Sequence, residues 1–221
     1  DLHGLPPSTG QIEAFLNDER DDAWGRLIDE LLQSPRYGER WGRHWLDVAR
    51  YADTNGMDED IAHPSAWRYR DYVIRSFNKD KPFDRFIVEQ LAGDLLPAKD
   101  LVQKREQTVG LGFLSVGPKM LACDDPDKMR RDIVDEQMDT MGRAFLGMTI
   151  GCARCHDHKI DPISIKDYYG LAGIFMSTKT LTKYSVVAEF HEHDLTKEEH
   201  QKKWLEVRRL EGEQKKKETL K

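Results

Sequence analysis

The stretch Gly151-Cys152-Ala153-Arg154-Cys155-His156-Asp157-His158-Lys159 holds two cysteines three positions apart, with a histidine directly after the second. Each thiol of such a pair can form a thioether with one vinyl group of haem, and the following imidazole can then ligate the iron. The stretch therefore predicts covalent attachment of haem c at Cys152 and Cys155, with His156 as an axial ligand. It also favours a helical fold, because the residues before it are spaced as in a helix.

Three other chemistries use the same cysteines. A thioredoxin-like redox pair lies at the start of a helix after a buried strand, and no strand pattern precedes Cys152. A structural zinc site needs four ligands, which Cys152, Cys155, His158 and a distant fourth residue would supply. A plain disulfide is the simplest alternative. The third cysteine, Cys123, is either a packed free thiol or the disulfide partner of Cys152 or Cys155.

Length, composition and charge limit the classes of protein to which the chain can belong. A chain of 221 residues can bury the core of one or two domains. It is 33% charged, and no apolar run approaches the roughly 20 residues of a membrane span. The net charge of −6 is spread over both signs, so the sequence gives no sign of a nucleic-acid partner.

Apolar residues at helical spacing predict a mainly α protein, an irregular multi-helix bundle with long loops. The expected helices begin near Ser8, Asp22, Tyr37, Pro64 or Ser65, Pro82, Leu101, Asp125 and Ser164. The third of them is expected to span residues 37–52. The helix that opens at Asp125 is expected to be the longest and to run as far as the cysteine motif.

The C-terminal part of the chain has a different pattern. Residues Tyr184 to Phe190 are the one convincing strand candidate, so at most a minor β hairpin is expected near residues 181–193. A highly charged helix capped by Thr196 follows. The sequence is therefore divided into a helical cytochrome-like domain, 1–178, and a short strand-like segment with a charged helix, 179–221.

The second axial ligand of the iron is open. His44 shares a helix face with Trp41, Trp45 and Val48, and is either a haem ligand or a hydrogen-bonded core histidine. His158 is too close to His156 to reach the opposite haem face, but it can bond to a haem propionate or to nearby groups. Further candidates are His63, Met120, Met141, Met148 and Met176, and an open sixth position is the remaining alternative.

Several longer motifs resemble one family. They are residues 37–41, 44–53, 67–71, 83–97 and 151–163. In these segments the chain resembles a planctomycete-type cytochrome domain family, from Leu5 to about Thr178. The resemblance implies one domain of a large exported protein, in which this domain accompanies other cytochrome-like or carbohydrate-associated domains. An export signal upstream of Asp1 is therefore expected.

Two functions follow from these observations. The first is a mono-haem c-type cytochrome domain, periplasmic or extracellular, that exchanges electrons with a redox partner protein or an adjacent cytochrome domain. Such a domain is an electron-transfer unit more than a self-contained enzyme. The alternative is a non-haem module, stapled by a metal or a disulfide, that binds or processes an extracellular substrate such as a polysaccharide.

Overall fold

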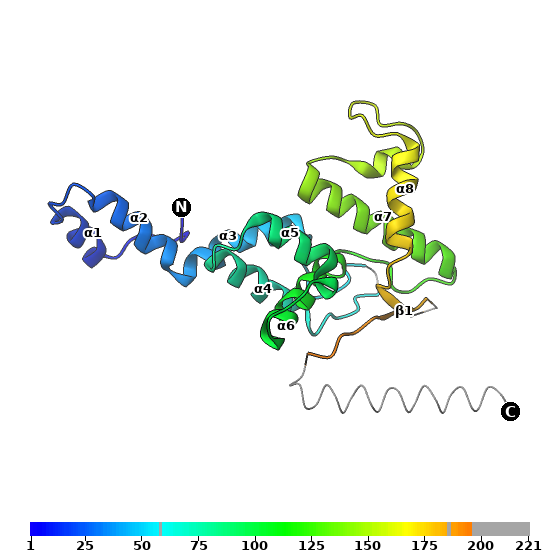
Figure 1. The fold of residues 1–221 in the computed structure, drawn as a ribbon, viewed down its shortest axis with the longest axis horizontal. Coiled ribbons are helices and arrows are strands. Elements are labelled where there is room, and N and C mark those ends of the chain that lie inside the picture. Colours follow the sequence, from blue (N-terminus) through cyan, green and yellow to red (C-terminus); the bar gives the residue numbers. More distant parts are fainter. Residues whose placement is uncertain (58, 185–186, 196–221) are drawn as a thin grey trace.

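The structure is a computed structural model that describes residues 1–57, 59–184 and 187–195 (Figure 1). This part of the chain is mainly helical and carries a small antiparallel sheet of two strands, which confirms the predicted fold class. The charged helix predicted from Thr196 onward lies outside the described residues. None of the described helices combines the length and the apolar character that crossing a membrane requires.

The elements follow one another as a series of short helices. The α-helices are α1 (Thr9–Leu16), α2 (Ala23–Gln33), α3 (Pro35–Val48), α4 (Ala66–Asn78), α5 (Phe83–Ala92), α6 (Leu101–Gly110), α7 (Pro126–Met141) and α8 (Ile165–Met176). Three 3₁₀ helices, η1 (Gly93–Leu95), η2 (Leu111–Leu114) and η4 (Ile150–Arg154), and one π-helix, η3 (Gly142–Leu146), lie between them. The strands are β1 (Leu181–Lys183) and β2 (Glu189–Phe190).

Local capping chemistry sets several helix starts. The Ser8 hydroxyl accepts a hydrogen bond from the backbone N–H of Gln11, and the Gln11 side-chain oxygen accepts one from the backbone N–H of Ser8. Helix α1 therefore has the expected capping box. Ser164 and Asp167 form the same arrangement at α8. At α7, the Asp125 carboxylate accepts backbone N–H groups of the first turn, where Pro126 occupies the first position.

Helices α3 to α6 surround the first of two main cores. Trp45, Tyr72, Phe86 and Phe113 form its centre, and the Trp45 indole N–H donates to Gln90 Oε1 at 2.9 Å. These rings bury large apolar areas, while the indole N–H keeps a hydrogen-bond partner.

Helix α3 approaches α4 closely because its packing face is built from small residues. A Cβ atom at Gly38 would lie 2.5 Å from the backbone oxygen of Ile74, so only glycine fits there. Gly42, Trp45 and Ala49 continue the same buried face. The face of α3 that carries Trp41 and Val48 is turned outward as a result.

Helices α7, α8 and η4 surround the second core. Met138, Ile150, Ala153, Tyr168 and Phe175 form it, and Figure 1 shows α7 and α8 side by side, apart from α3 to α6. The ring of Phe145 joins the two halves because it stacks on Trp45, with ring centroids 5.8 Å apart.

A buried ionic network also joins the halves. Arg50, in the left-handed conformation at φ 56°, donates to Glu136 Oε1 on α7 at 2.7 Å. The ammonium of Lys119 lies 2.6 Å from Glu136 Oε2, and the Lys119 side chain is 0% exposed. The Lys119 ammonium also donates to the Gly117 carbonyl oxygen at 3.3 Å. Burial lowers the pKa of Lys119, and the nearby Glu136 carboxylate opposes that change.

Several sequence expectations are corrected here. The third helix ends at Val48 instead of Ala52, because Arg50 turns into the left-handed region, which a helix does not tolerate. The helix from Asp125 does not reach the cysteine motif: α7 ends at Met141, a π turn follows, and Gly147 at φ 65° reverses the chain.

The predicted strand over residues 184–190 is also wrong as a single element. The structure has a hairpin in its place, with Leu181 opposite Phe190, which confirms the minor hairpin expected near residues 181–193. Leu181 is buried with Leu121 and Met129 in a third, smaller cluster. Burial of Leu181 in this cluster anchors the hairpin on the helical body.

Helices α1 and α2 extend away from this body (Figure 1). Neither contains a buried residue, and Trp24 on α2 is 63% exposed. Phe15 packs edge-on against Trp24, and the imidazole of His3 bonds to the carbonyl oxygen of Leu31 at 2.8 Å. Local contacts of this kind hold the pair together.

Candidate functional site

The cysteine motif begins on η4, a short helix that is docked by its apolar residues, and Cys155 and His156 follow directly after its end. Ile150 and Ala153 are buried against α7 and α8. Because Ala153 sits between the two cysteines and faces inward, Cys152 and Cys155 both face outward and are exposed. Gly142 permits this docking, since a Cβ atom there would lie 2.7 Å from the Ile150 side chain.

Polar contacts also fix η4 against its neighbours. The guanidinium of Arg154 donates to Asp135 Oδ2 on α7 at 3.0 Å, and the Tyr168 hydroxyl donates to Asp135 Oδ1 at 2.6 Å. The Tyr169 hydroxyl donates to the backbone oxygen of Arg154 at 3.2 Å. Burial, followed by the contact with Asp135, raises the pKa of Tyr168, which therefore stays a neutral donor. Sequence reasoning missed these anchors, because the partners are far apart along the chain.

Both thiols of the motif are free in the structure. Cys152 Sγ lies 3.8 Å from the hydroxyl oxygen of Thr149, and no disulfide joins any of the three cysteines. Cys123 is half-buried and packs in the third cluster, near Leu121 and Met129. The disulfide considered between Cys123 and the motif is therefore not formed.

His156 is exposed, and its free nitrogen can be identified. Its Nδ1 lies 2.8 Å from the backbone oxygen of Asp157. A carbonyl oxygen only accepts, so Nδ1 carries a proton, and in the neutral imidazole the lone pair is then on Nε2. An imidazole with Nδ1–H bonded to a carbonyl and Nε2 free is the form that ligates metals.

His158 has a different part in the same loop. Its Nδ1 accepts the backbone N–H groups of Ile160 and Asp161 at 3.2 and 2.7 Å. Its Nε2 must then be protonated, and it donates to the Thr149 hydroxyl at 3.1 Å. Both ring nitrogens are occupied, so His158 closes the loop after the motif. Of the two partners considered for it, a haem propionate or nearby groups, the structure shows the nearby groups. The carboxylate of Asp157 similarly accepts the backbone N–H of Ile165 at the start of α8.

His44 lies in a different environment from the one expected. It is exposed on the outer face of α3, and its ring meets Trp41 edge-on with centroids 5.4 Å apart. The expectation that its helix face is buried is wrong, because the face with Gly38 and Gly42 packs against α4 instead. Among the described residues, no hydrogen bond or ring contact joins His44 to the motif.

The other ligand candidates are dispersed. Met141, Met148 and Met176 are half-buried around the second core, and His63 lies beside β2. In the part of the chain that the structure describes, no three His, Cys, Asp or Glu side chains gather as a metal-binding group. The zinc alternative at Cys152, Cys155 and His158 therefore has no complete ligand set in this part.

The donor groups of the motif fit covalent haem c. Attachment requires two free thiols on one side of a short helix and an imidazole nitrogen after the second. The exposed Cys152 and Cys155 and the free Nε2 of His156 meet that requirement. A second axial ligand is not brought next to them by any contact described above.

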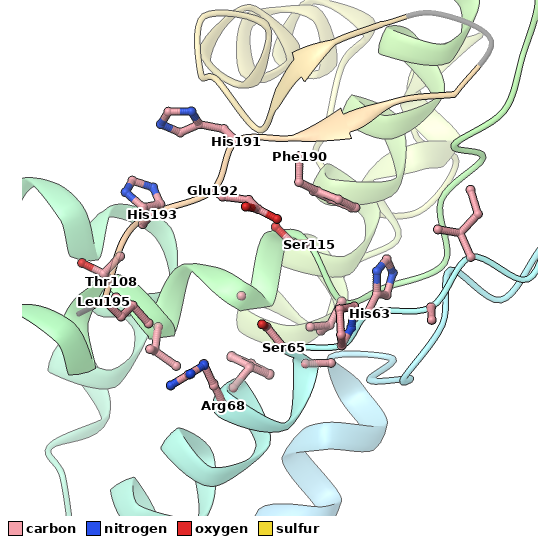
Figure 2. Close-up of a pocket in the computed structure, with 18 of the residues that line it drawn as sticks. His63, Ser65, Arg68, Thr108, Ser115, Phe190, His191, Glu192, His193 and Leu195 are labelled. Atoms are coloured by element: carbon pink, nitrogen blue, oxygen red, sulfur yellow. The ribbon is translucent and has the colours of Figure 1, made fainter. Parts of the chain in front are cut away.

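A second feature, a pocket, lies away from the motif (Figure 2). Its lining residues include His63 and Ser65 just before α4, Arg68 in the first turn of α4, Ser115 just after η2, and Phe190 in β2. Burial and the nearby Lys119 lower the pKa of His63. Sequence reasoning missed this pocket, because its walls come from segments that are distant in the chain.

Comparison with known proteins gives one match. The family model of PSCyt2, a protein of unknown function (DUF1549), matches residues 1–180. No curated protein and no solved structure matches the chain. The matched range contains every helix described above and the whole cysteine motif. The chain therefore belongs to the PSCyt2 family, a planctomycete-type domain family of unknown function.

Proposed function

We propose that this domain carries one haem c, attached through Cys152 and Cys155, with His156 Nε2 as an axial ligand of the iron. The observation that carries the proposal is the pair of free, exposed thiols on either side of the buried Ala153, followed by an imidazole whose Nε2 is free. Each S–H bond adds across one vinyl double bond, so no group leaves and no oxidant is needed. Haem bound in this way supplies one-electron transfer.

The neighbouring residues would hold the attachment site rigid. Arg154 and Asp135 tie η4 to α7, and His158 closes the following loop through both ring nitrogens. Such second-sphere contacts keep a ligating imidazole in one orientation. The proton on His156 Nδ1, held by the carbonyl of Asp157, keeps Nε2 available as the ligand.

The exposure of the motif supports an electron-transfer role over that of a self-contained enzyme. Cys152, Cys155 and His156 are all exposed, so a group attached there is accessible from the protein surface. The partner is accordingly a redox protein or an adjacent cytochrome domain of the same exported protein. Because covalent attachment of haem takes place outside the cytoplasm, a periplasmic or extracellular location is part of the proposal.

The deciding experiment is the spectrum of the denatured protein. The full chain, made in cells with a haem-attachment system, should keep a haem spectrum in denaturant, because thioether bonds survive unfolding. Cys152→Ala with Cys155→Ala should remove the colour, whereas Cys123→Ala, the matched control, should retain it. A colourless wild-type protein from the same cells, in the folded state, refutes the proposal.

The same preparation tests the distal ligand. If His44 completes the coordination of the iron, His44→Ala should turn a low-spin spectrum into a high-spin one that binds carbon monoxide. An unchanged spectrum excludes His44.

A further inference from the structure

Figure 2 shows a cavity between three segments that are distant in the sequence. Its volume is about 320 Å³. One wall comes from residues 61–69, which lead into α4, the second from residues 108–121 and the third from residues 188–195, which include β2. Because three segments must fold together to make it, the cavity is a product of the native structure.

The interior of the cavity is mainly apolar. Val116 and Leu121, which are both buried, and Phe190 are among its lining residues. The Phe190 ring meets His63 edge-on, with ring centroids 5.4 Å apart. A volume of this size with apolar walls and a few convergent polar groups is typical of a small-molecule site.

One buried polar atom in the lining lacks a partner. His63 Nε2 is shielded from solvent and makes no hydrogen bond to the described residues. Burial and Lys119 lower the pKa of His63, so its ring is neutral at pH 7 and can donate or accept one hydrogen bond. An unsatisfied buried nitrogen costs free energy, which a bonding group of a ligand would recover.

The charged side chains of the lining are balanced. Arg68 and Glu192 come from opposite walls and are both exposed. The guanidinium of Arg68 lies 4.6 Å from the centre of the Trp67 ring. One positive and one negative group give the mouth no net preference for an ion, and the apolar interior opposes the burial of a charge.

We propose that this cavity binds a small uncharged cyclic or aromatic molecule with one hydroxyl or carbonyl group, which bonds to His63 Nε2 while its apolar body rests on Val116, Leu121 and Phe190. This site is separate from the cysteine motif and does not depend on haem.

The test uses 2-naphthol as the probe on the full chain. Calorimetry should give one site, and proton contacts in NMR should connect the probe with the methyl groups of Val116 and Leu121. The anion 2-naphthoate should bind at least about tenfold more weakly, because its charge must lose water. His63→Phe, which keeps a ring and removes the nitrogen, should weaken 2-naphthol about fivefold to tenfold.

A cavity-filling variant and a matched control complete the design. Ser115→Phe should abolish binding by occupying the cavity, whereas Ser177→Phe, on the exposed surface after α8, should leave it unchanged. If Ser115→Phe does not fold, the NMR contacts of the wild type decide. Absence of those contacts, equal binding by folded Ser115→Phe, or equal or tighter binding of 2-naphthoate overturns the proposal.

Discussion

Removal of the Glu136 carboxylate should destabilise the protein strongly. The carboxylate lies 2.6 Å from the Lys119 ammonium and 2.7 Å from the Arg50 guanidinium, at the junction of the two helical halves. The Lys119 side chain is 0% exposed, so in Glu136→Gln its charge would stay buried after losing the carboxylate that pairs with it. Loss of one partner from a buried pair of this kind costs about 3–5 kcal/mol of unfolding free energy.

The opposite truncation should be milder. In Lys119→Met the Glu136 carboxylate keeps its bonds to Arg50 and to the Thr140 hydroxyl, at 2.7 and 3.0 Å. We expect a loss of about 1–2 kcal/mol for the removed contact. The double variant, Lys119→Met with Glu136→Gln, should be more stable than Glu136→Gln alone, because it contains no uncompensated buried ammonium. The coupling energy between the two substitutions should be about 2 kcal/mol.

Urea unfolding at pH 7 measures all three variants. The midpoints should shift while the slope stays constant, provided that unfolding is two-state. For a chain of this length the melting temperature of Glu136→Gln should fall by about 6–20 °C. Lys128→Met with Asp132→Asn, an exposed ion pair on the same helix, is the matched control and should change stability by less than about 1 kcal/mol. Equal losses in Lys119→Met and Glu136→Gln, or a double variant that costs their sum, would refute the reasoning.

Two further predictions concern pH and helix packing. Burial and Lys119 lower the folded-state pKa of His63, so the unfolded chain binds more protons than the folded one as the pH falls through the ordinary value of about 6.5, and the free energy of unfolding decreases. Urea midpoints measured from pH 8 down to pH 5 should therefore decrease, and the decrease should be smaller in His63→Gln. An equal decrease in both proteins would contradict this prediction. Gly38→Ala should destabilise the protein by about 1–3 kcal/mol, because the new Cβ would lie 2.5 Å from the Ile74 oxygen. Gly25→Ala, which has open space around it inside α2, should instead stabilise the protein by about 0.5–1 kcal/mol, and thermal unfolding measures both variants.

The caps and the fold class were predictable from the sequence because their causes are local. The Ser8 and Ser164 capping boxes join residues only three positions apart. Helical spacing is likewise a property of a single segment, so the mainly helical fold followed from the pattern alone. The motifs of the family also lie within short stretches, and the family match over residues 1–180 accords with the resemblance seen in them.

The end of α7 and the place of His44 were not predictable, because their causes are distant in the chain. Apolar spacing continues past Met141, but docking of Ile150 against Gly142 stops the regular helix there. His44 shares its sequence pattern with Trp45, yet the close approach of Gly38 to Ile74 decides which face of α3 is buried. A sequence pattern shows that a helix has an apolar face, whereas its partner determines which face is covered.

The cysteine motif combines both kinds of information. The spacing of Cys152, Cys155 and His156 is a property of the sequence, and the prediction of haem attachment rests on it. Only the tertiary structure decides that Ala153 turns inward and both thiols outward, and that the Thr149 hydroxyl and the loop backbone occupy both nitrogens of His158. The physical reason is that residue order fixes which donor groups are neighbours, whereas exposure and hydrogen-bond partners depend on segments that meet only after folding.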